Sequence, residues 1–105
     1  MKNPYGFIQS SVIISCEISP PIASSYVNII GWLEKIDNQI VQLNLESKTK
    51  YNLLPNKNLI IHNLTKSDDH RNYACIIRNQ IDNNTKQSRF KTLRVRGNFK
   101  QIILF

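Results

Sequence analysis

The chain has 105 residues, of which 41% are hydrophobic and 20% charged, a balance that is ordinary for one folded domain. Fourteen Lys and Arg against seven Asp and Glu give a formal net charge of +7, which suits an anionic partner without naming one. Acidic residues and histidines are too scarce to favour acid–base or metal chemistry, and no apolar run approaches the roughly 20 residues that span a bilayer.

The first half of the chain reads as short strands separated by turns. An edge strand is expected around Tyr5 and Phe7, and further strands over residues 11–18, 26–34 and 39–45. The prolines at 20 and 21 end the strand 11–18, because proline cannot donate a hydrogen bond to a sheet. The polar pair at 37 and 38 predicts a turn.

The second half continues in the same way. Strands are expected over residues 51–54, 58–64, 72–78 and 86–96, with polar loops at 46–50, 65–69 and 79–84. This gives about eight or nine short strands with frequent turns, which is typical of an all-β sandwich.

One domain over residues 1–97 is therefore predicted, followed by a tail or the start of another domain at 98–105. The first residues, Met1 to Tyr5, precede no apolar run of the signal-peptide kind, so no signal peptide is expected there.

Two cysteines decide between the β folds. Cys16 and Cys75 lie in two expected strands; Trp32 lies in a strand between them, and Asp69 and Tyr73 come shortly before the second cysteine. In an immunoglobulin sandwich two cysteines bridge the sheets, a tryptophan packs on the bridge and a tyrosine hydroxyl bonds to backbone. This spacing predicts such a sandwich with one inter-sheet disulfide, in an oxidising and hence extracellular compartment. The alternative is two buried free thiols in an intracellular protein.

Alternation also predicts core and structural positions. Leu59 and Ile61 share one face of their strand and are expected in the core. Asp69 is expected to pair with a cation near the start of the strand 51–54, and Lys50 is the nearest.

Short motifs in both halves of the chain narrow the comparison. They are Cys16-Glu17-Ile18, Tyr26-Val27 ahead of Trp32, Lys50-Tyr51, Leu54-Pro55, Leu59-Ile60-Ile61 and Tyr73-Ala74-Cys75. Together, over roughly residues 12–95, they resemble variable-type immunoglobulin domains of arthropod Down syndrome cell adhesion molecules (Dscam). The resemblance implies a glycoprotein domain on the cell surface, membrane-bound only through the anchor of its parent protein. It also implies cell adhesion by homophilic pairing with an identical copy on another cell.

Alternation selects a face for such pairing. If Cys16 and Leu59 point inward, their alternate neighbours point outward in two strands that are neighbours in one sheet, the ABED sheet of this fold. Together with the upstream edge strand they form the candidate homophilic interface: Tyr5, Phe7, Ile13, Ser15, Ile60 and His62. The outer face of the opposite sheet, with Leu33 and Ile76, is one alternative, and the absence of any interface in this domain is another.

The expected last strand carries a candidate patch for an anionic partner. Its cations are Lys86, Arg89, Lys91, Arg94 and Arg96. They would bind a heparan-type glycan or another cell-surface protein, or merely protect an exposed edge strand from aggregation. No helix-turn-helix, RNP or zinc-finger pattern accompanies them, so nucleic acid is not expected.

Two sequons are candidate N-glycosylation sites, at Asn63 and Asn83, and the second falls in an expected loop. The cysteines and histidines lack the spacing of a zinc site, and no phosphate-binding loop or Gly-x-Ser-x-Gly motif is present. We expect no enzyme activity, no metal and no cofactor.

Overall fold

The computed structural model describes residues 3–17, 26–45 and 50–97, and the structural statements below concern those residues. The prolines at 20 and 21, the loop 46–49 and the tail 98–105 lie outside them. In the part described, no helix has the length and apolar character needed to cross a membrane.

The described residues form ten short strands and one 3-10 turn, η2. In chain order these are β1 (Tyr5–Phe7), β2 (Val12–Ile14), β3 (Val27–Ile36), β4 (Gln39–Gln42), β5 (Tyr51–Leu53), β6 (Leu59–Ile61), η2 (Lys66–Asp68), β7 (Asn72–Asn79), β8 (Thr85–Gln87), β9 (Lys91–Thr92) and β10 (Arg94–Arg96). The expected turn at Asp37 and Asn38 joins β3 to β4, and the positive φ of both residues (50° and 68°) suits a tight hairpin.

The expected last strand, residues 86–96, is wrong as a continuous element because it is broken into β8, β9 and β10. At the first break the Ser88 Oγ accepts the backbone N–H of Cys75 at 2.9 Å, in place of a backbone carbonyl. The same hydroxyl donates to the Arg89 carbonyl at 3.0 Å, and strand pairing with β7 resumes only at β9.

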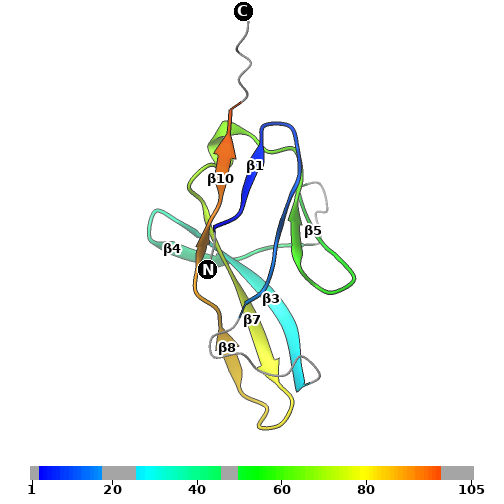
Figure 1. Cartoon of the computed structure of the whole chain (residues 1–105). Helices are drawn as coiled ribbons and strands as arrows, with labels where there is room; N and C mark the ends of the chain where they lie inside the picture. The colour runs from blue at the N-terminus through cyan, green and yellow to red at the C-terminus, as the bar shows by residue number, and fades with distance from the viewer. Residues whose placement is uncertain (1–2, 18–25, 46–49, 98–105) are drawn as a thin grey trace, which may run out of the picture.

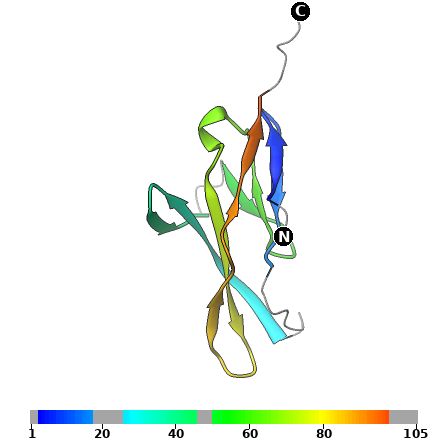
Figure 2. The same cartoon turned by 60° about the vertical axis from the view of Figure 1, so that its left-hand side comes forward.

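The strands form two layers (Figure 1). One is the antiparallel sheet β2-β6-β5, and the other is the antiparallel sheet β4-β3-β7-β8, with β9 also paired to β7. Parallel β1 and β10 continue the second layer, because Leu93 exchanges backbone hydrogen bonds with His70 and Arg71 just before β7. The β3–β4 hairpin projects from one side, and the β7–β8 hairpin extends from the end opposite β10 (Figure 2).

The core lies between these layers and is stapled across them. Cys16 and Cys75 form a disulfide with 5.6 Å between their Cα atoms. Trp32 is 1% exposed beside it, and its indole Nε1 donates to the Lys57 carbonyl at 3.0 Å. Leu59 and Ile61 are fully buried. The predicted sandwich and its inter-sheet bridge are confirmed.

The hydrogen bond to backbone expected for the Tyr73 hydroxyl is not observed, since the hydroxyl bonds to side chains instead. Tyr73 donates to the Glu34 Oε2 at 3.2 Å, and that oxygen also accepts from Tyr51 Oη at 3.3 Å and Arg71 Nη1 at 2.7 Å. Glu34 faces inward because a bulge near Ile30 shifts the register of β3, so that Glu34 lies opposite Tyr73. Burial raises the pKa of Tyr73 far above its usual value, which keeps the phenol a donor.

The expected pairing of Lys50 with Asp69 is also wrong. The Lys50 Nζ lies 2.6 Å from Asp68 Oδ2, and this carboxylate also accepts the backbone N–H of Thr65 at 2.8 Å in a capping box. The box turns Asp68 into the protein, so that its neighbour Asp69 faces β10 and pairs with Arg94 instead.

Removing the bridge should cost much of the stability of the domain. The double variant Cys16→Ala, Cys75→Val should lower the free energy of unfolding by about 4 kcal/mol, as chain entropy predicts for closing a loop of this length. Urea denaturation of the variant and the wild type measures this. An unchanged midpoint would show that the two layers hold together without the bond.

Replacing the inward carboxylate should also destabilise the fold. Glu34→Gln leaves the Arg71 guanidinium without an anionic partner, and we expect a loss of about 2 kcal/mol, below the cost for a fully buried pair because Arg71 is 31% exposed. Tyr51→Phe, which removes one hydrogen bond to the same oxygen, should cost about 1 kcal/mol. Equal losses for the two variants would contradict the dominance of the ion pair.

Candidate interaction surface

The outer side of the sheet β2-β6-β5 contains most of the expected interface. Ile13 lies directly opposite Ile60 in the antiparallel pair β2–β6. Ile13 is 50% exposed and Ile60 is half-buried, whereas Val12, Ile14, Leu59 and Ile61 on either side are buried. The alternation predicted for these two strands is therefore confirmed. We call this surface the β2–β6–β5 face, comprising Ser11, Ile13, Ser15, Asn52, Ile60 and His62.

A hydrogen-bonded row crosses this face beside the isoleucines. The His62 Nδ1 lies 3.1 Å from Ser11 Oγ, and its Nε2 lies 3.0 Å from Asn52 Oδ1. Since the amide oxygen of Asn52 can only accept, the His62 Nε2 donates to it. The imidazole thus links β5, the end of β6 and the start of β2.

The strands of this face carry no charge, because β2, β5 and β6 contain no Asp, Glu, Lys or Arg. Two charged pairs lie at its borders, Lys50 with Asp68 at 2.6 Å and Glu17 with Lys91 at 3.0 Å, whereas Lys57 in the β5–β6 loop is exposed and forms no ion pair with a described residue. Burial alone would raise the pKa of Asp68, but hydrogen bonds from Lys50 and from the Thr65 amide outweigh it and hold that pKa below its usual value.

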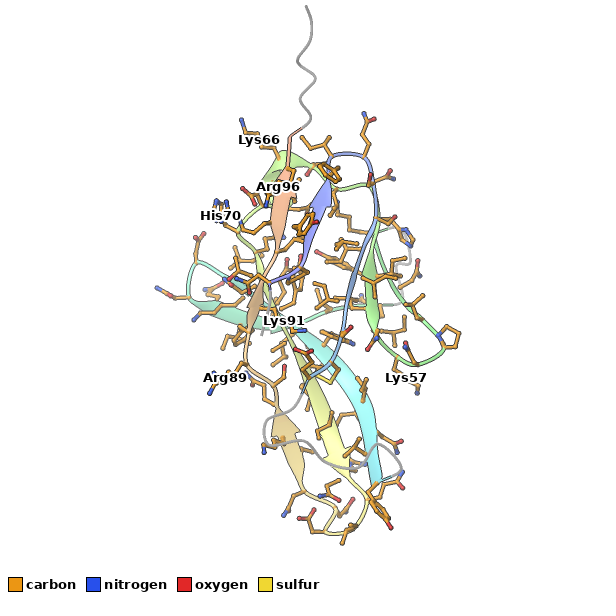
Figure 3. All side chains as sticks on the ribbon, in the orientation of Figure 1. Lys57, Lys66, His70, Arg89, Lys91 and Arg96 are labelled. Atoms are coloured by element: carbon orange, nitrogen blue, oxygen red, sulfur yellow. A yellow bond between two sulfur atoms is a disulfide. The ribbon has the colours of Figure 1, made fainter. Side chains whose placement is uncertain are left out.

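Lys91 does not belong to the expected anion-binding patch. It is 8% exposed, and its Nζ donates to the Ser15 carbonyl at 3.1 Å besides pairing with Glu17. Lys91 alternates with Leu93 and Val95 toward the interior, which carries the ammonium group across to the residues after β2. The remaining cations of the patch are also divided: Figure 3 shows Arg89 well separated from Arg96 along the molecule.

The structure divides the expected homophilic residues as well. Tyr5 and Phe7 lie on β1, which pairs with β10 and not with β2 or β6. Their side chains are therefore neighbours of Arg94 and Arg96, while Ile13, Ser15, Ile60 and His62 remain together on the other sheet.

The outer face of the larger sheet offers a second apolar area. Ile30 and Ile40 are exposed there, at 43% and 51%, and Leu33 and Ile76 are half-buried. Sequence reasoning named the last two and missed the exposed pair, although Ile40 stood in a strand already expected to alternate.

The asparagines of both sequons are exposed and have left-handed backbone conformations, with φ of 49° for Asn63 and 61° for Asn83. Asn83 lies in the β7–β8 hairpin, away from the β2–β6–β5 face, whereas Asn63 follows His62 directly. The Thr65 hydroxyl of the first sequon contacts Ser67 and Asp68, at 2.8 and 3.2 Å.

An open pocket of about 420 Å³ lies between the β3–β4 turn and the loop before β7. The charged groups Asp69 and Arg71 in its wall are engaged in ion pairs with Arg94 and Glu34. Within residues 3–17, 26–45 and 50–97, no cluster of three or more His, Cys, Asp or Glu is placed to hold a metal ion.

The paired Asp68 should make stability depend on acid pH. Its pKa is lower in the folded chain than the unfolded value of about 4, so its contribution is complete above that pH and is lost as the pH falls through the lower, folded pKa. Urea unfolding across this range should show a shallower acid-side loss for Asp68→Asn than for the wild type. At neutral pH the variant should be less stable by about 2 kcal/mol. Parallel pH curves would contradict the role of this carboxylate.

No protein-family model and no curated protein matches the sequence. The structure, however, is similar to solved Dscam chains. One, solved to explain Dscam isoform specificity, has a TM-score of 0.75 at 21% identity over 91% of this chain. The four N-terminal Ig domains of Dscam1 isoforms 9.44 and 8.4 give TM-scores of 0.72 and 0.73 at 24% and 20% identity, each over 92% of this chain.

This chain spans 24% of the length of each of these three structures, about one domain of several. At such identities the likeness concerns the fold, and it agrees with the two antiparallel layers, the Cys16–Cys75 bridge and the buried Trp32. The chain is an immunoglobulin-like β-sandwich domain that resembles the Ig domains of Dscam.

Proposed function

We propose that this domain mediates cell adhesion by homophilic recognition, binding a second copy of itself through the β2–β6–β5 face. The observation that carries the proposal is the absence of charged residues from β2, β5 and β6 in a chain of net charge +7. Two identical cationic molecules repel one another, so a shared contact is favoured where neither copy presents its excess charge.

The arrangement of this face suits a two-fold contact. Ile13 and Ile60 stand side by side at its centre, and in a symmetric dimer each pair can pack on the pair of the other copy. The Ser11–His62–Asn52 row beside them presents polar groups that are already hydrogen-bonded, which lowers the cost of excluding water.

Two further facts agree with this function. The disulfide is typical of proteins in oxidising compartments, which supports an extracellular domain on a cell-surface parent protein. One of the similar structures was solved to explain the isoform specificity of Dscam, a protein named for cell adhesion. The rival function is recognition of a different cell-surface protein, in which case the isolated domain would remain a monomer.

Analytical ultracentrifugation of the wild type over a micromolar to millimolar series separates these functions. We expect reversible self-association, weakened at least about tenfold in Ile13→Asp, Ile60→Asp, because the dimer would bury unpaired carboxylates. The matched control is Ile30→Asp, Ile40→Asp, which adds the same charge to the outer face of the other sheet and should leave the dimer intact.

Three outcomes would contradict the proposal. A strict monomer at all concentrations would favour a heterologous partner. Loss of the dimer in the control alone would move the interface to the outer face of β4-β3-β7-β8. Equal loss in both variants would show that added charge, and not its place, decides association.

A further inference from the structure

The pairing of β1 with β10 creates a surface that joins two sets of residues expected to act separately. In this parallel pair Tyr5 lies opposite Arg94 and Phe7 lies opposite Arg96. All four side chains are exposed, while Gly6 and Val95 between them face inward. Two aromatic rings and two guanidinium groups therefore share one side of a two-stranded ribbon, here called the β1–β10 face.

The side chains of this face are held in place by one another and by Asp69. The Arg96 guanidinium lies over the Tyr5 ring, 5.2 Å from its centroid, and the rings of Tyr5 and Phe7 meet edge to face at 6.3 Å. The Asp69 Oδ1 accepts from Arg94 Nε at 3.3 Å and from the backbone N–H of Val95 at 2.7 Å. This contact uses the Nε of Arg94, and no hydrogen bond of its terminal nitrogens to another described side chain is found, so they can donate to a ligand.

The charge around this face is incompletely neutralised. Asp69 is the carboxylate that pairs with Arg94 and His70, whereas Arg96 forms no ion pair with a carboxylate in the part of the chain described. Lys66 on η2 is exposed, η2 packs against β10, and Figure 3 shows Lys66 and Arg96 at the same end of the molecule. The excess positive charge favours an anionic partner and disfavours a second copy, since a two-fold contact would oppose arginine to arginine.

We propose that the β1–β10 face binds a sulfated polysaccharide of the glycosaminoglycan class. The guanidinium fork matches the paired oxygens of sulfate and carboxylate groups, and exposed aromatic rings pack against the apolar faces of sugar rings. The disulfide indicates an oxidising compartment, where sulfated polysaccharides and not nucleic acids are the abundant polyanions. Lys86, Arg89 and Lys91 have no part in this site.

This site is separate from the surface proposed for homophilic contact. The β1–β10 face belongs to the layer of β7, and the β2–β6–β5 face belongs to the other layer. Glycan binding and self-association can therefore be tested one without the other. The variant Ile13→Asp, Ile60→Asp should retain glycan binding whether or not it dimerises.

Titration calorimetry with a size-defined heparin oligosaccharide at physiological salt tests the proposal. Wild type should bind, and Arg94→Ala, Arg96→Ala should bind at least about tenfold more weakly, because two charge-assisted contacts are lost. The matched control, Lys86→Ala, Arg89→Ala, removes the same charge elsewhere on the last strands and should change affinity less than about twofold.

Two more variants keep the result interpretable. Loss of Arg94 also removes its ion pair with Asp69 and could disturb folding. The variant Lys66→Ala, Arg96→Ala keeps that ion pair, and it should also weaken heparin binding. Tyr5→Ala, Phe7→Ala changes no charge and should still weaken binding, which diffuse electrostatic attraction does not predict. Thermal unfolding of each variant establishes that it is folded.

The proposal is overturned if heparin does not bind the wild type. It is also overturned if neither Arg94→Ala, Arg96→Ala nor Lys66→Ala, Arg96→Ala loses more affinity for heparin than the control Lys86→Ala, Arg89→Ala. It is also overturned if polyglutamate or phosphatidylserine vesicles bind the wild type more tightly than heparin does. Those results would assign the face to an acidic protein or to a membrane surface.

Discussion

Cys16, just after β2, and Cys75, at the centre of β7, join the two layers of the sandwich by a covalent bond across its core. Most of the other interior contacts are arranged around this bond: Trp32 lies opposite Cys75 in the register of β3 and β7, and Leu59 and Ile61 fill the facing sheet. A chain of 105 residues has a limited core, so a bond that restricts its unfolded ensemble contributes a large part of the total stability. This disulfide holds together the two layers that carry the β2–β6–β5 face and the β1–β10 face.

The few carboxylates of this basic chain determine where its positive charge remains. Glu17, Glu34, Asp68 and Asp69 neutralise Lys91, Arg71, Lys50 and Arg94. Three of these pairs lie inside the protein or at the border of the β2–β6–β5 face, which is left without charge on its strands. The fourth holds Arg94 on the β1–β10 face, beside Arg96, which forms no ion pair with any carboxylate among the described residues. One side is thereby suited to a second copy of the chain and the other to a polyanion.

Part of this surface was predictable from alternation along the strands. Ile13 and Ile60 were expected outward and Leu59 and Ile61 inward. Successive side chains of a strand point to opposite faces of the sheet, so one residue known to be buried sets the direction of all the others in that strand. The same reasoning failed in the last strand, because the breaks after Gln87 turn Lys91 inward, away from the cations expected beside it. The bulge in β3 sets the register that places Glu34 opposite Tyr73, a contact for which the sequence made no prediction. A single inserted or unpaired residue reverses every direction that follows it, and no local signal marked these positions.

The sequence by itself determined the sandwich, since two cysteines, a tryptophan and a Tyr-x-Cys motif at this spacing are typical of an immunoglobulin core with an inter-sheet disulfide. It also determined the excess of cations and the turn at Asp37 and Asn38, because composition and local backbone preference do not depend on distant residues. Only the tertiary structure decided which acid meets which base and which strand lies beside β1. Asp68 and Asp69 are adjacent in sequence and chemically identical, and the cations that they meet, Lys50 and Arg94, lie 18 and 25 residues away along the chain. Such choices depend on contacts between segments far apart in the chain, which a linear pattern does not contain.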